Sequence, residues 1–254
     1  MKLLVSGEGS SDMGACNNAQ GVCCDADFSP GPMALWLSRL WEPLLGYDLL
    51  SIPEAVIFVS ETALHQASKH SGGRMQRLRG VNRPAETGLY FSNARQLGLK
   101  ALERQGAGDA PLMAVLFRDA DGTRSAPGQL WSAKWQSMLD GFKDAGFEFG
   151  VPMLPKPKSE AWLLSTTQPG GHSHEALESI SGNDKSPHSA KSQLDHALGG
   201  PQSAAQLAQW CQDHPPSWEQ LQTMPSFKAF FDRFHEVAQL ILRPAAAQPH
   251  HGAL

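Results

Sequence analysis

The sequence predicts an α/β fold, with a parallel-stranded sheet flanked by helices and a helical C-terminal part. Short apolar runs of strand length alternate with longer segments of helical periodicity through residues 1–165. The runs are nearly continuous rather than alternating, which is typical of strands buried on both faces of a parallel sheet. Residues 189–243 contain no such run and keep helical spacing.

Four apolar runs are the expected strands, at residues 3–6, 55–59, 112–117 and 147–154. Between them, apolar side chains recur every three or four positions and predict helices at residues 32–45, 89–104 and 131–142. Pro32 stands in the expected first turn of the first helix, where proline is well tolerated. Short connections between these elements favour a parallel sheet.

The composition divides the chain into one main domain with additions. We expect an α/β domain, a surface loop rich in Gly, Ser and His, a helical extension packed on the same domain, and a flexible tail, at residues 1–165, 166–188, 189–243 and 244–254. His172 and His174 lie in the expected loop, and exposed histidines are commoner than metal ligands.

The charge balance excludes a general polycation. The 254 residues carry 21 basic and 25 acidic side chains, a net charge of −4, so any contact with nucleic acid needs a local basic patch. The N-terminal apolar run is too short for a signal peptide, and no run approaches the roughly 18 apolar residues of a membrane span. We therefore expect a soluble protein with no membrane partner.

The cysteines suggest neither a disulfide framework nor a zinc site. Cys16, Cys23 and Cys24 lie close together in the sequence and Cys211 stands apart. Their spacing lacks the paired cysteines of known zinc modules. Unpaired cysteines favour a reduced, cytoplasmic setting.

Acidic residues follow three of the expected strands. Glu8 comes after the first strand, Asp119 and Asp121 after the third, and Glu160 after the fourth, where Ser159 is placed to cap a helix. Each of these alone is compatible with an ordinary polar turn. Together they indicate one site at the carboxyl edge of the sheet, where α/β proteins bind ligands. Carboxylate oxygens are hard ligands that suit Mg²⁺.

A basic segment lies between the second expected strand and the following helix. No acidic residue occurs between Glu61 and Glu86, while five basic residues do: Lys69, Arg74, Arg77, Arg79 and Arg83. The segment is either a phosphate-binding surface or a solvated basic loop. Arg118 and Arg124 flank the paired aspartates, and either contact phosphate or balance the local acidic charge.

Four segments together resemble a known fold family. They are Val5-Ser-Gly-Glu-Gly, Leu116-Phe-Arg-Asp-Ala-Asp-Gly, Lys158-Ser-Glu-Ala-Trp-Leu-Leu and Pro225-Ser-Phe-Lys-Ala-Phe. Their order is similar to that of the TOPRIM fold of topoisomerases, bacterial primases and the nuclease domain of overcoming-lysogenization-defect (OLD) proteins. The chain resembles most closely small bacterial TOPRIM-like proteins of unknown function.

This resemblance implies roles for individual residues. Glu8 would be the acid at the first strand, acting in acid–base chemistry or metal binding. Asp119 and Asp121 would be the metal-binding pair, and Glu160 the later acid of the nuclease branch. Nuclease members often carry a lysine after that acid, a position that either Lys191 or Lys185 could fill.

The resemblance also implies an activity, namely Mg²⁺-dependent cleavage of DNA or RNA, with Mn²⁺ as an alternative ion. A partner protein such as an ATPase and a role in defence against phage follow from the same likeness. Two other functions stay open from the residues alone. One is a non-catalytic module that binds nucleic acid or protein, and the other is a phosphohydrolase of small molecules, for which the basic segment would be dispensable.

Overall fold

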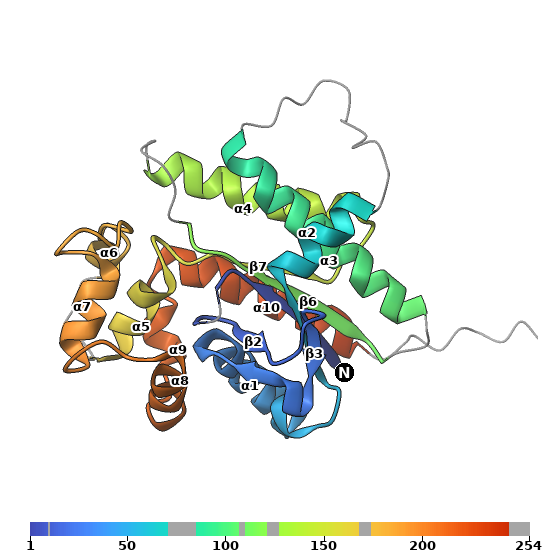
Figure 1. Cartoon of the computed structure of the whole chain (residues 1–254), viewed down its shortest axis with the longest axis horizontal. Helices are drawn as coiled ribbons and strands as arrows, with labels where there is room; N and C mark the ends of the chain where they lie inside the picture. Colours follow the sequence, from blue (N-terminus) through green and yellow to red (C-terminus); the bar gives the residue numbers. More distant parts are fainter. Residues whose placement is uncertain (10, 71–84, 107–109, 121–126, 168–173, 244–254) are drawn as a thin grey trace, which may run out of the picture.

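A computed structural model describes residues 1–9, 11–70, 85–106, 110–120, 127–167 and 174–243. Its centre is a five-stranded sheet of order β3-β5-β1-β6-β7 (Figure 1). The parallel strands are β5 (Val56–Ser60), β1 (Lys2–Gly7), β6 (Leu112–Phe117) and β7 (Gly150–Met153), and β3 (Val22–Cys24) pairs antiparallel to β5. The predicted α/β class and parallel sheet are confirmed.

The register of the sheet places three strand ends side by side. Gly7, the last residue of β1, pairs with Ser60 of β5 and with Phe117 of β6. The residues that follow, Glu8, Glu61 and Arg118, therefore leave the sheet at the same level. Gly7 also allows close packing, because a Cβ there would lie 2.6 Å from the Cβ of Met13.

Helices cover both faces of the sheet. On one face lie α2 (Glu61–His70), α3 (Ala85–Gly106) and α4 (Pro127–Asp144), while α1 (Pro32–Leu45) and α10 (Pro225–Leu242) cover the other (Figure 1). The remaining helices, near one end of the molecule, are α5 (Ser159–Thr167), α6 (His174–Leu177), α7 (Ala190–Ala197), α8 (Ala204–Asp213) and α9 (Trp218–Leu221). Smaller elements are β2 (Gly14–Cys16), η1 (Asp25–Asp27), β4 (Phe28–Pro30) and η2 (Leu49–Ser51).

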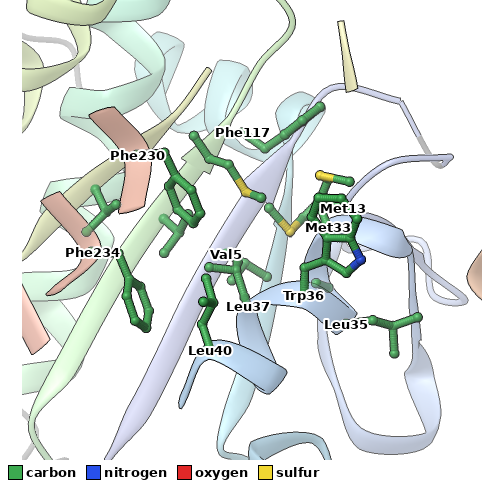
Figure 2. Close-up of a cluster of buried hydrophobic side chains, with 14 of the residues drawn as sticks. Val5, Met13, Met33, Leu35, Trp36, Leu37, Leu40, Phe117, Phe230 and Phe234 are labelled. Carbon is green, nitrogen blue, oxygen red and sulfur yellow. The ribbon is translucent and has the colours of Figure 1, made fainter. Parts of the chain in front are cut away.

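The strands are apolar on both sides because each face has its own core. Val5 packs with α1 and α10 residues such as Trp36 and Phe230 (Figure 2). Leu4, its neighbour in the strand, points to the opposite core beneath α3 and α4. Every residue of β6 is buried for the same reason. Among the described residues, no helix is long and apolar enough to cross a membrane.

Residues 166–188, expected to be a surface loop, contain the short helix α6. Leu177 at its end is buried, and the Glu178 carboxylate accepts a 2.6 Å hydrogen bond from the backbone N–H of Ser226. The hydrogen bond thus attaches the segment to α10, while Leu177 joins the core on that side of the sheet. The helical C-terminal part follows as predicted, in α7 to α10.

The expectation of unpaired cysteines is wrong. Cys16 and Cys23 form a disulfide, while Cys24 and Cys211 are free. The chain turns back between β2 and β3, which brings the two Cα atoms to 5.6 Å, a normal separation for a disulfide. Because disulfides are rare in reducing compartments, the cysteines no longer support a cytoplasmic setting.

Candidate functional site

Arg118, Glu8 and Glu61 form an ion network at the shared strand ends, which we call the arginine network. The buried Arg118 guanidinium donates to Glu8 at 2.6 Å and also donates to Glu61. The ring of Tyr90 lies 5.2 Å from the guanidinium carbon. Burial acts to lower the pKa of Arg118, but the two carboxylates outweigh it and raise that pKa, so the arginine stays charged.

The same network holds the loop after β6. The backbone N–H of Asp119 donates to Glu8, and the Tyr90 hydroxyl donates to the carbonyl of Asp119 at 2.9 Å. Buried Lys134 donates to the carbonyl of Ala120 at 2.9 Å. Backbone bonds of 3.0 and 3.1 Å tie the loop to the exit of β7. The position of Asp119 is therefore fixed by several independent contacts.

Three carboxylates meet around Ser159, the first residue of α5, and we call them the acidic cluster: Asp12, Asp119 and Glu160. The Asp119 carboxylate accepts the backbone N–H of Ser159 at 3.1 Å. The Ser159 hydroxyl donates to Asp12 and lies 3.5 Å from a Glu160 oxygen. The sequence predicted Ser159 as the cap of this helix; in the structure Asp119 accepts its first N–H instead. Glu160 lies in the first turn, as predicted.

Two members of the acidic cluster, Asp12 and Glu160, have raised pKa values. Burial raises the pKa of Asp12, an effect that the hydroxyls of Ser159 and Ser11 and the charges of Lys158 and Lys191 only partly offset. Burial, followed by the charge of Asp12, raises the pKa of Glu160. Within the described part of the chain, neither Asp12 nor Glu160 forms an ion pair. A cation placed between these carboxylates would therefore be strongly favoured.

The residues singled out by the sequence fall into three groups. Glu8, Asp119 and Glu160 come together at one sheet edge, but Glu8 belongs to the arginine network rather than to the acidic cluster. Lys191 lies exposed in α7, close enough for its charge to act on Asp12, whereas Lys185 is exposed with no such effect on it. Lys69 is exposed on α2. Outside the described residues lie Asp121, Arg74, Arg77, Arg79, Arg83 and Arg124.

Sequence reasoning missed four residues of this region: Asp12, Glu61, Tyr90 and Lys158. Glu61 directly follows β5 and could have been found by the rule that selected Glu8, since it is also an acid at a strand exit. Asp12 lies four residues beyond Glu8 in the same loop. No pattern in the sequence indicates Tyr90, because its contact with the Asp119 loop depends on how α3 packs.

The donor chemistry of the acidic cluster fits a hard divalent cation, because three carboxylates come from separate strand exits and the pKa values of two of them are raised. Within the described ranges, no group of three or more His, Cys, Asp or Glu side chains is already placed to hold a metal ion. A metal site here would thus need side-chain adjustment or a further ligand.

Comparison with protein-family models, with curated proteins and with solved structures finds no match for this chain. The likeness to the TOPRIM fold therefore rests on the four sequence segments alone.

Proposed function

We propose that this protein is a metal-dependent phosphodiesterase of TOPRIM type that cleaves nucleic acid. The observation that supports the proposal is the acidic cluster. Three strand exits deliver Asp12, Asp119 and Glu160 to one serine, and burial raises the pKa of two of them. Such unfavourable charge is typical of functional sites, where chemistry rather than stability decides which residues are present.

In this proposal Mg²⁺ or Mn²⁺ is held by Asp12, Asp119 and Glu160, together with Asp121 from the Asp119 loop. When bound, the ion supplies an activated water and relieves charge on the phosphate oxygens. The arginine network holds the Asp119 loop in place, so Glu8 acts as a positioning residue. Lys158 and Lys191 contribute positive charge beside the carboxylates, which favours the approach of a phosphodiester.

The remaining parts of the proposal rest on the sequence. The basic residues between positions 69 and 83, with Arg124, would hold the nucleic-acid backbone near the cluster. A partner such as an ATPase and a role in phage defence follow from the TOPRIM resemblance alone. The location in the cell is likewise a prediction, against which the Cys16–Cys23 disulfide counts.

Cleavage assays with Asp119→Ala test the proposed function. Single- and double-stranded DNA and RNA would be incubated with Mg²⁺, with Mn²⁺ or with a chelator. We expect wild-type cleavage that requires the metal, and a loss of about 100-fold or more in the variant, because a ligand and the contact with Ser159 are both removed.

Asp213→Ala is the matched control, since Asp213 is an exposed aspartate at the end of α8. It should cleave at the wild-type rate. Equal metal-dependent cleavage by wild type and Asp119→Ala would refute the proposed function. Binding of nucleic acid without any cleavage would instead favour the non-catalytic module.

A further inference from the structure

An open cavity of about 430 Å³ adjoins the site on the β5 side of the sheet. It lies between the end of β1, the start of α2 and the turn that connects β2 to β3. Gly7 and Gly9 line it, and these residues flank Glu8 of the arginine network. Its volume is within the range of roughly 300–1,000 Å³ that small-molecule sites occupy.

The wall formed by the β2–β3 turn is internally braced. The disulfide between Cys16 and Cys23 closes the base of the turn. The Asn18 side chain donates to the carbonyl of Val22 at 3.0 Å and accepts the N–H of Gly21 at 3.1 Å. A 2.7 Å backbone bond from Ser60 to the Gly21 carbonyl fastens the turn to β5. A wall held in this way exists before any ligand arrives, which lowers the cost of binding.

The described lining is neutral and polar, which favours the uncharged part of a ligand over a phosphate group. No lysine or arginine occurs among the described residues that line the cavity, and the one acid among them, Glu61, is already paired with Arg118. Phe58 and Ala63 lie at its floor and are almost fully buried, while amide and hydroxyl groups make up the more accessible lining: Asn18, Gln20, Ser60, Thr62 and Gln66. Neutral hydrogen-bonding groups of this kind suit the edges of a nucleobase and the hydroxyls of its sugar.

The cavity and the acidic cluster share the loop that carries Glu8. The Glu8 carboxylate binds the Asp119 N–H, and Arg118 joins Glu8 to Glu61 at the cavity edge. These contacts form one continuous series from the cavity edge at Glu61 to Asp119 of the acidic cluster.

We propose that this cavity binds the nucleoside part of a single nucleotide unit next to the phosphate that is cleaved. This inference rests on the proposed function and names a substrate subsite for it. A single-stranded chain is the expected substrate, because a base within a duplex would have to be unstacked to enter. A free nucleotide has the same chemistry, and the binding experiment separates these two sources.

Calorimetric titration with Ca²⁺ present measures binding, because the ion offsets the carboxylate charge beside the phosphate, and the probes recovered afterwards are checked to be uncleaved. The probes are the four nucleoside 5′-monophosphates, ribose 5-phosphate as the matching ligand without a base, and a single-stranded tetranucleotide. We expect at least one nucleotide to bind about ten-fold tighter than ribose 5-phosphate, which corresponds to about 1.4 kcal/mol. Tighter binding of the tetranucleotide would identify a nucleic-acid chain as the source, and equal binding a free nucleotide.

Ala19→Trp and Thr62→Trp fill the cavity from exposed positions, so neither change needs space in the core. Both should remove most of the advantage of the nucleotide over ribose 5-phosphate. Ala205→Trp, on the exposed side of α8, is the control and should keep the advantage. No preference for any nucleotide, or a preference that both cavity variants retain, would overturn the inference.

The two proposals fail in different ways. Metal-dependent cleavage without a nucleotide preference would leave the proposed function standing and remove the subsite. Nucleotide binding that Asp119→Ala retains, with no cleavage under any condition, would keep the subsite and remove the proposed function.

Discussion

The arginine network and the acidic cluster lie at the same sheet edge, share one loop, and balance their charges in opposite ways. In the arginine network, two carboxylates each contact the same buried guanidinium. In the acidic cluster, Asp12 and Glu160 share the hydroxyl of Ser159, and Asp12 also accepts the hydroxyl of Ser11. Lys158 acts on both acids through its charge, and Lys191 acts on Asp12. The pKa of the arginine is raised, which favours its charge, and the pKa values of both acids are raised, which opposes theirs.

The arginine network and the acidic cluster therefore differ in what they contribute to stability. A carboxylate with a direct cation stabilises the fold around it, whereas partly buried carboxylates without one cost stability until a cation arrives. Because Glu8 is bonded to the Asp119 N–H, the arginine network fixes the position of an acid in the acidic cluster. At this sheet edge the arginine network therefore holds the loop after β6 in place, and the acidic cluster concentrates negative charge.

The largest expected effect on stability comes from the loss of the arginine network. Arg118→Met removes the cation that two partly buried carboxylates share and should lower the free energy of unfolding by about 2 kcal/mol. The value falls below the roughly 3–5 kcal/mol typical of fully buried pairs, because Glu8 and Glu61 keep 27% and 36% of their side chains exposed. Urea unfolding followed by circular dichroism measures the change.

Arg95→Met is the matched control for this comparison. Arg95 also pairs with an aspartate across two elements, at 2.6 Å from Asp144, but both side chains are about one-third exposed. Its replacement should cost less than about 1 kcal/mol. If Arg118→Met and Arg95→Met lowered the free energy of unfolding equally, the arginine network would stabilise the fold no more than an exposed ion pair does.

Much of the fold could be predicted because it depends on local patterns. Continuous apolar runs identify the strands of a parallel sheet, since both faces of each strand are covered by helices. The run at residues 112–117 matches β6 in full, and the chain from Pro32 forms the expected helix α1. The disulfide between Cys16 and Cys23 could not be predicted, because it depends on how the chain turns back between β2 and β3.

The arrangement of the site was only partly accessible from sequence. The rule that acids at parallel strand ends share one edge applies to Glu8 and Asp119, because the strands end in register. The acids divide into the arginine network and the acidic cluster because of the direction that the Arg118 side chain takes. That direction is set by its contacts with Glu61 and with Tyr90 of α3. Such contacts between distant elements leave no periodic signal in the sequence.

A pair of glutamate variants should change stability in opposite directions. Glu8→Gln removes the charge that Arg118 and the Asp119 N–H contact, and should cost about 1.5 kcal/mol. Glu160→Gln removes a partly buried charge next to Asp12, and should raise the free energy of unfolding by about 0.5 kcal/mol. The changes are the same in chemistry and size, so each variant is the control for the other in metal-free urea titrations. If both variants lowered the free energy of unfolding, the charge of Glu160 would be compensated by its neighbours, as the charge of Glu8 is.

The smallest expected effect is a difference in pH dependence. A carboxyl whose pKa is raised on folding holds its proton longer in the folded state, so its contribution to stability falls as the pH rises. For Asp12 and Glu160 this fall starts near the ordinary carboxyl pKa of about 4 and continues up to their raised values. Other carboxyl groups also titrate in this pH range. The informative quantity is therefore the difference in the free energy of unfolding between wild type and the double variant Asp12→Asn/Glu160→Gln.

Without metal, the double variant and wild type should have similar stability near pH 4, and the variant should gain on wild type as the pH rises through the raised pKa values of Asp12 and Glu160. Lys158, Lys191 and Asp184 also face this region, and all three are present in both proteins. Adding Mg²⁺ at pH 7 should stabilise wild type and not the variant, because only wild type keeps the full set of acids that would hold the ion. A stability difference that stays constant with pH would mean that the acidic cluster carries no excess charge. A difference that varies as expected while Mg²⁺ has no effect would mean that the charge is relieved by a substrate or partner rather than by a metal.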